Sequence, residues 1–87
     1  MVSYKIILSK QVRKKDFPKL PKNVRIKVVA VIGSLAGNPK PSSAMKLTNR
    51  EEYKIRQGKC RILYVVWDEK RIIEVRRVML RGEDYKP

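Results

Sequence analysis

The chain contains no histidine and only one cysteine, Cys60. A single cysteine excludes an internal disulfide, and without histidine it does not supply the ligand set of a zinc centre. We therefore expect neither a metal ion nor another cofactor. A chain with so little cysteine suits the reducing cytoplasm.

Long hydrophobic stretches are also missing. The apolar run 28–32, for example, is far shorter than a membrane-spanning helix requires. Near the N-terminus, Lys5 interrupts the apolar residues too early for a signal peptide. We therefore expect a cytoplasmic protein without a membrane partner, and its 87 residues predict one small domain, 1–87, with a thin core.

Acidic residues are scarce. The chain has 8 Asp and Glu against 22 Lys and Arg, which gives a net charge of +14 and a pI near 10.4. Such a charge repels itself within the folded chain and attracts polyanions. Nucleic acid is the first partner that this composition predicts, and an acidic protein is the second.

The N-terminal half predicts a strand and two helices. Alternating apolar residues indicate a strand over 2–8, and Ser9 can cap a short basic helix from Lys10 to about Phe17. A second helix is predicted over 24–35 because its apolar residues recur at helical spacing and Gly37-Asn38-Pro39 follows. This segment is also rich in β-branched residues, which favour a strand.

The C-terminal half predicts strands over 44–48, 52–57, 60–67 and 72–80. The fold class is therefore α+β, in which an N-terminal strand and a helix pair pack on an antiparallel three- to four-stranded sheet. The strand 60–67 is almost continuously apolar, so we expect it to be buried on both faces, with Tyr64 and Trp67 in the core. Arg76 and Arg77 are consecutive and should face opposite sides of their strand.

Cations cluster in these strands. The pleat places Lys54 and Arg56 on one face of their strand, and Arg61 follows just across a tight turn. Arg81 and Tyr85 come after the final strand. Such a site works with cations and a phenol, which suits a phosphodiester: cations stabilise the charged transition state, and tyrosine can move a proton. The plainer alternatives are a solvated basic face and a tyrosine that anchors the C-terminus.

These residues resemble a known family. The motifs Y-K-I-R (53–56), G-K-C-R-I-L-Y (58–64) and V-M-L-R-G-E-D-Y (78–85), with Lys46-Leu47 before them, are similar to the RelE/ParE toxin superfamily. The resemblance extends over essentially the whole chain and implies a RelE-like fold. Its core pattern R-x-G-x-x-R-I-L-Y is fairly specific for the superfamily but does not separate the branches.

The RelE branch implies a ribosome-dependent endoribonuclease that cuts messenger RNA, whereas the ParE branch implies a gyrase inhibitor without a nuclease site. The catalytic residues implied by the RelE resemblance are Lys54, Arg56, Arg61, Arg81 and Tyr85. We expect Lys46, Arg50 and Lys59 to bind RNA beside them. Many relatives carry a histidine just before the arginine that matches Arg81, where this chain has Leu80.

The mechanism implied by the resemblance is attack of a ribose 2′-OH on the adjacent phosphate, which requires RNA. Tyr85 is the candidate base, and Lys54 competes with it if crowding by arginines lowers its pKa. The implied partners are the ribosome with its messenger and an acidic antitoxin, which forms a hetero-oligomer with the toxin. The alternative is a non-nuclease: a ParE-like gyrase inhibitor or an inactive basic module that binds the antitoxin.

Overall fold

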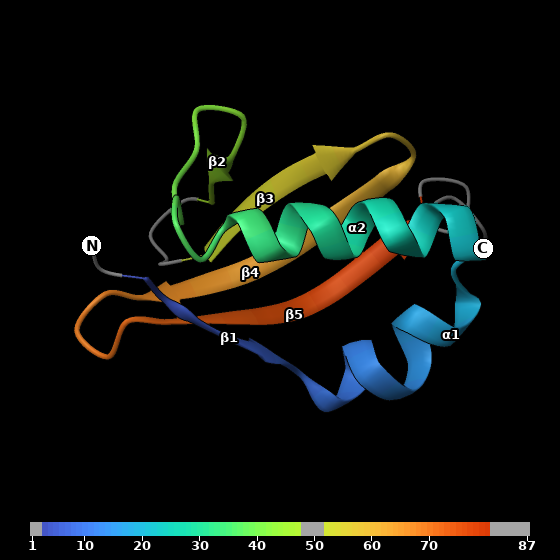
Figure 1. The fold of residues 1–87 in the computed structure, drawn as a ribbon, viewed down its shortest axis with the longest axis horizontal. Coiled ribbons are helices and arrows are strands. Elements are labelled where there is room, and N and C mark those ends of the chain that lie inside the picture. The colour runs from blue at the N-terminus through green and yellow to red at the C-terminus, as the bar shows by residue number, and fades with distance from the viewer. Residues whose placement is uncertain (1–2, 48–51, 81–87) are drawn as a thin grey trace.

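The computed structural model describes residues 3–47 and 52–80. Its elements are β1 (Lys5–Leu8), the π-helix η1 (Val12–Asp16), α1 (Phe17–Lys19), α2 (Lys22–Ser34), β2 (Met45–Lys46), β3 (Glu52–Gln57), β4 (Cys60–Trp67) and β5 (Ile72–Leu80). The strands form one sheet in the order β1-β5-β4-β3-β2, and α2 lies across one face of it (Figure 1). The predicted α+β architecture is confirmed, and the strands β3, β4 and β5 have the predicted bounds.

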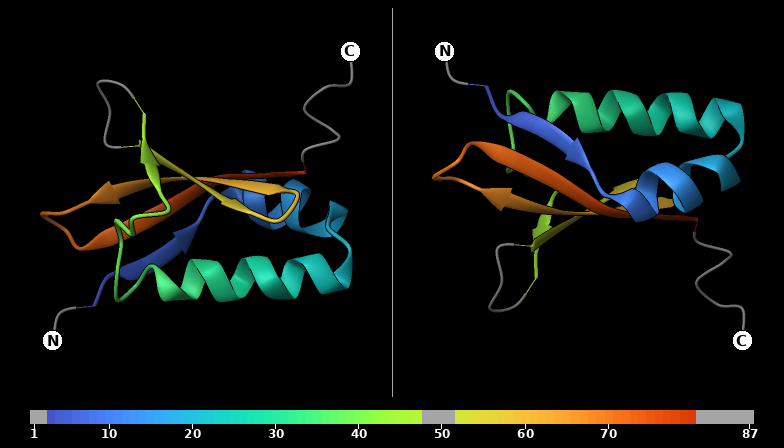
Figure 2. Two further views of the ribbon diagram at one scale, coloured as in Figure 1. Left: turned by 90° about the horizontal axis from the view of Figure 1, so that it is seen from above. Right: turned by 90° about the horizontal axis from the view of Figure 1, so that it is seen from below.

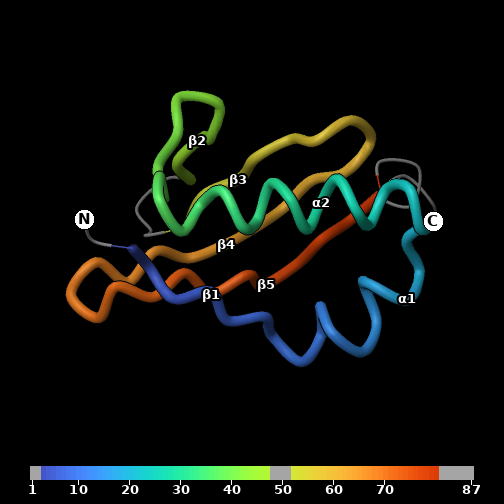
Figure 3. Tube along the Cα trace, viewed as in Figure 1, coloured from blue at the N-terminus to red at the C-terminus, as the bar shows by residue number. Residues whose placement is uncertain are grey.

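The N-terminal strand enlarges the sheet beyond the expected three or four strands. β1 pairs in parallel with β5, from Lys5 opposite Ile72 to Leu8 opposite Val75, so the sheet is mixed and has five strands. The chain therefore passes through the helices and the antiparallel strands before β5 returns to the side of β1 (Figure 3). Tyr4, Ile6 and Leu8 pack against the core, as their alternation predicted.

Beyond β1, the edge of β5 is covered by the first helical segment. Ser9 caps this segment as predicted: its hydroxyl accepts a hydrogen bond from Val12 N at 3.2 Å and donates one to the Arg76 carbonyl at 3.0 Å. Further along, Asp16 is only 4% exposed and accepts a hydrogen bond from Val78 N at 2.9 Å. A polar side chain thus satisfies an edge amide that would otherwise be buried without a partner.

The core lies between α2 and the sheet. The prediction that 24–35 is a helix is confirmed, because α2 ends at Ser34 and its inward residues Val28 and Ile32 join one buried cluster with the strands. From the sheet this cluster takes Ile62, Tyr64 and Val66, among others. Packing against the sheet therefore overrides the β-branched composition of the segment.

Tyr64 is the largest fully buried side chain of this core. It is fully buried, its ring stacks on that of Tyr53 with 5.7 Å between centroids, and its hydroxyl donates a hydrogen bond to the Pro39 carbonyl at 2.9 Å. Burial raises the pKa of Tyr64 to about 12, because the phenolate cannot be hydrated there. This bond connects the sheet to the loop that follows α2.

A β-bulge changes which face each residue of β5 occupies. Leu63 lies opposite Arg77, but the next residue of β4, Tyr64, lies opposite Val75, so Arg76 is the extra residue. As a result Val75 and Val78 both face the core, although they are three positions apart, and both arginines are exposed. The expectation that Arg76 and Arg77 face opposite sides is wrong, because it assumed an unbroken pleat.

The strand β4 is less buried than its composition suggested. Arg61 and Leu63 are half-buried, and Trp67 is 42% exposed, so the placement of Trp67 in the core is wrong. The cause is the architecture: α2 lies on one side of the sheet, and no helix of the described residues lies on the other (Figure 2). A continuous apolar run therefore does not require two covered faces.

Candidate functional site: a basic face on the uncovered side of the sheet

The predicted cations Lys54, Arg56 and Arg61 lie on the uncovered face of the sheet. Their neighbours Tyr53 and Ile55 are buried under α2, so the pleat turns Lys54 and Arg56 the other way. Arg61 is the direct cross-strand partner of Arg56 across the β3–β4 turn. Gly58 in this turn has a φ of 59°, a conformation that glycine adopts without strain.

The register extends this group to β5. One row across the strands consists of Lys54, Leu63 and Arg77, and the next consists of Arg56, Arg61 and Met79. We call Lys54, Arg56, Arg61 and Arg77 the basic face. Side chains in direct cross-strand pairs start only about 5 Å apart, so these cations repel one another unless an anion lies among them.

Within the described ranges, 3–47 and 52–80, no side chain neutralises Lys54 or Arg56. Two glutamates share their side of the sheet but lie one row away, where Glu52 and Glu74 flank Val65. Glu74 already accepts contacts of 3.4 Å from Arg76 and from the Trp67 indole. The face is thus divided into a cationic end and an acidic row, and only the cationic end suits a phosphate.

Arg77 was missed by the sequence analysis, as was its partner Asp16. The carboxylate of Asp16 accepts a hydrogen bond from Arg77 Nε at 3.1 Å and one from Gln11 Nε2 at 3.2 Å. The bulge hid Arg77, because in a regular pleat Arg76 and not Arg77 would lie opposite Leu63, in the row of Lys54. The sequence does contain a signal for Asp16. It is the single acidic residue among the cations of 10–19, which indicates a specific interaction of its carboxylate.

The other predicted residues are distributed differently. Lys46 in β2 is exposed and pairs with Tyr53, whose side chain faces α2, so it does not join the basic face. Lys59 is exposed in the β3–β4 turn. Arg50, Arg81 and Tyr85 lie outside the described residues.

Leu80, the last residue of β5, belongs to the other side of the sheet. It pairs with the buried Cys60 and lines a cavity of about 490 Å³ beneath the start of α2, together with Pro21 and Val24. A histidine at this position would therefore not be directed toward Lys54. Cys60 is itself unsuited to be a nucleophile, because burial raises the pKa of its thiol.

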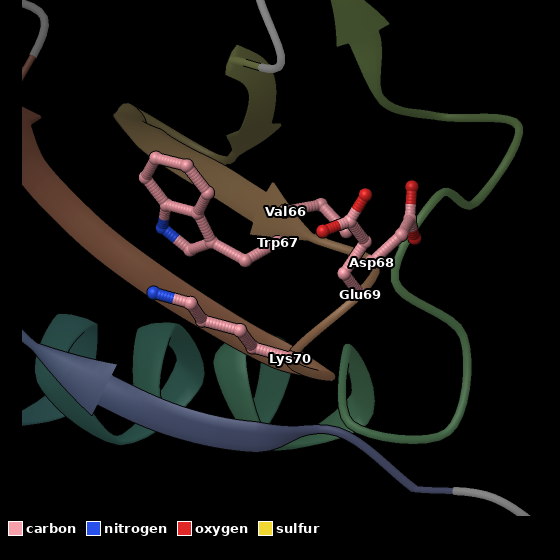
Figure 4. A pocket seen from close by; sticks show the side chains of 5 residues that line it. All are labelled: Val66, Trp67, Asp68, Glu69 and Lys70. Carbon is pink, nitrogen blue, oxygen red and sulfur yellow. The ribbon is translucent and has the colours of Figure 1, made fainter.

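A second hollow of about 420 Å³ surrounds the β4–β5 turn, far along the sheet from Arg61. Figure 4 shows Trp67 and Lys70 side by side there, with Lys70 Nζ 6.0 Å from the centre of the indole ring. Asp68 in the same turn accepts hydrogen bonds from Lys40 Nζ at 2.8 Å and from the Tyr4 hydroxyl at 2.7 Å, which lower its pKa. The acidic residues Asp68 and Glu69 both line this hollow, so it is a poor phosphate site.

The described residues were also compared with the requirements of a metal site and of a membrane span. No three potential metal ligands come together in the part of the chain that the structure describes. None of its helices is long and apolar enough to span a membrane.

Comparison with known proteins places the chain in a family. The family model described as "ParE toxin of type II toxin-antitoxin system" matches residues 6–85. The chain belongs to this toxin family. No curated protein matches it.

Solved structures confirm the fold of the toxin. A chain of the RelBE2 toxin–antitoxin complex from Mycobacterium tuberculosis superposes with a TM-score of 0.81 at 28% identity, covering 92% of this chain and 100% of that one. The archaeal RelE–RelB complex from Pyrococcus horikoshii gives 0.78 at 24% identity over 92% and 97%. The isolated RelE toxin of E. coli gives 0.79 at 22% identity over 90% and 84%, which shows likeness of fold alone.

Proposed function

We propose that this toxin is an endoribonuclease that cuts messenger RNA on the ribosome. The observation that carries the proposal is the convergence of Lys54, Arg56 and Arg61 on one uncovered face of the sheet, with Arg56 directly opposite Arg61. These cations can hold a phosphate and stabilise the additional charge that develops on it during 2′-OH attack. The sequence resemblance implies that Arg81 and Tyr85 complete the site, and both lie outside the described residues.

The roles follow from the chemistry of each side chain. Arg61 is half-buried and held by its strand, so it suits a fixed bidentate contact to the scissile phosphate. Arg56 is more exposed and suits an adjacent phosphate of the messenger. Tyr85 is the proposed base, and Arg81 is a second donor to the transition state. An unperturbed phenol has a pKa of about 10, so the base needs cations around it to work near neutral pH.

The ribosome supplies what this site lacks. A set of cations with one phenol has no strong acid–base pair, so the rate depends on how well the messenger is oriented. The net charge of +14 favours association with ribosomal RNA. We further propose an acidic antitoxin as the protein partner, since the solved structures similar to this chain include toxin–antitoxin complexes.

The family match favours a second candidate, inhibition of gyrase without nuclease chemistry, because the matching family is described by its ParE toxin. Two assays separate the candidates: cleavage of messenger on programmed ribosomes, and supercoiling by gyrase. Cleavage on ribosomes with little cleavage of free RNA supports the nuclease. Inhibited supercoiling without cleavage would replace it by the ParE-type activity.

Variants then test the site itself. Arg61→Ala and Arg81→Ala should each lower single-turnover cleavage about 100-fold, the usual loss when one transition-state donor is removed. Arg25→Ala is the matched control, because Arg25 is exposed on α2, away from the basic face. Equal rates for Arg25→Ala and Arg61→Ala would show that the basic face is not the catalytic surface.

A further inference from the structure

The first helical segment carries a second concentration of positive charge. Five of the ten residues over 10–19 are cations, and the side chains of all five are exposed. We call them the ridge: Lys10, Arg13, Lys14, Lys15 and Lys19. The ridge lies along the far half of β5, beyond the end of β1 (Figure 1).

No acid of its own segment balances the ridge. The only acidic residue there, Asp16, faces inward and is occupied by Val78 N, Arg77 and Gln11. Pairs such as Lys10 with Lys14 are four residues apart, a spacing at which like charges on a helical surface repel each other. The folded chain keeps this repulsion, and a polyanion would relieve it.

Arg77 makes the ridge continuous with the basic face. Its Nε contacts Asp16, at the base of the ridge, while its backbone lies opposite Leu63, in the row of Lys54. Its side chain is still 45% exposed, so its guanidinium has donors left for a ligand. Positive charge therefore extends from the open side of the sheet around the edge at β5.

The surface of the ridge suits a phosphate backbone better than a protein. Protein interfaces are built around a buried apolar centre, whereas phosphate contacts need only donors and charge. Of the apolar residues of this segment, Val12 is buried and Phe17 packs against the core, so neither offers a partner an apolar centre. By contrast, α2 exposes Ile26 and Val29, 61% and 50% accessible, which are features of a protein-binding surface.

We propose that the ridge is a second phosphate-binding surface, which docks the toxin on structured ribosomal RNA while the basic face takes the messenger. This inference rests on the proposed function, because it assumes that the ribosome is the place of action. It assigns the two surfaces different tasks. The ridge sets affinity for the ribosome, and the basic face sets the rate of cleavage once the toxin is bound.

The test compares Lys14→Glu/Lys15→Glu with the control Arg25→Glu/Lys27→Glu, which makes the same change in net charge on α2. All four positions are exposed, so both variants should fold, which circular dichroism and urea unfolding verify. Binding to purified ribosomes carrying a messenger is measured over a range of KCl concentrations. Single-turnover cleavage is measured at saturating ribosome.

The ridge variant should bind at least about tenfold more weakly than the control. The slope of log affinity against log salt should fall in magnitude by about 2, one for each lost phosphate contact. Cleavage at saturation should stay within about twofold of the parent, so that KM changes and kcat does not. Affinity and salt slope equal to those of the control would overturn the inference. So would a ridge variant that loses only the binding of an acidic protein.

The two proposals can fail separately. If the parent binds ribosomes through the ridge but does not cut messenger, the nuclease proposal fails and the docking surface stands. If the parent cuts messenger and the ridge variant matches the control in both assays, the docking surface fails and the nuclease stands. Arg61→Ala supplies the reciprocal control, because it should lose cleavage while its salt slope falls by no more than about 1, for the single phosphate contact that Arg61 makes.

Discussion

Removal of the Asp16 carboxylate should destabilise the domain more than any surface substitution. Asp16→Ala leaves Val78 N buried without an acceptor and deprives Arg77 of its ion pair. An unsatisfied buried donor costs about 1–3 kcal/mol, and the loss of a hydrogen bond to a charged group costs a similar amount. Because Arg77 is half-exposed and regains water, we expect a total loss of about 3 kcal/mol. A domain of this length has roughly 4–13 kcal/mol of stability in all.

Asp16→Asn separates the contribution of the hydrogen bond with Val78 N from that of the ion pair with Arg77. The amide oxygen still accepts a hydrogen bond from Val78 N, but the neutral amide no longer attracts Arg77, so the expected loss is about 1.5 kcal/mol. Urea unfolding measures all three proteins, and Lys15→Ala, an exposed neighbour, is the control. A cost below about 0.5 kcal/mol for Asp16→Ala would refute the reasoning, since it would mean that this end of β5 does not need the carboxylate.

Four further changes test the site and the core. Tyr64→Phe should cost about 1 kcal/mol at neutral pH, because the Pro39 carbonyl loses its hydrogen bond. It should also reduce the loss of stability that the parent shows as the pH rises from about 10 toward 12: the pKa of Tyr64 is raised to about 12, so in that window this phenol ionises only in the unfolded chain. Asp68→Asn should weaken the dependence of the melting temperature on pH in the acid range. The lowered pKa of Asp68 gives stability that is lost as the pH falls below its ordinary pKa of about 4. Tyr85→Phe should lower single-turnover cleavage about 100-fold and leave ribosome binding intact, and cleavage near the parent rate would exclude it as the base. Leu80→His should lower the urea midpoint without raising cleavage, because this position faces the core side; a gain in cleavage would contradict that placement.

Much of the fold can be predicted from the sequence because local signals agree with the final packing. Alternation in β3 and the glycine turn after it are enough to place Lys54, Arg56 and Arg61 on one face. The helical spacing of the apolar residues in α2, with the stop signal after it, outweighs a composition that favours strand. Each of these features depends on a few neighbouring residues, and that is why the sequence reveals it.

The wrong expectations concern interactions between distant segments. The pairing of β1 with β5 joins residues more than sixty positions apart, and no local pattern predicts it. The bulge in β5 shifts the face of every residue beyond Arg76, and it is defined only against β4. Trp67 was expected in the core because its strand is apolar throughout, yet burial depends on which side α2 covers.

The parallel pairing of β1 with β5 also bears on when the toxin becomes folded during its own synthesis. A chain is made from its N-terminus, so β1 emerges first and must wait for its partner strand, while α2 and the strands β2 to β4 are still being translated. Ser9 meets Arg76 across a separation of 67 residues, a high contact order that delays closure of this edge. A ribosome that is making this protein thus carries an incomplete sheet until most of the message has been read, which leaves a window in which a partner can engage the nascent chain before the toxin is fully formed.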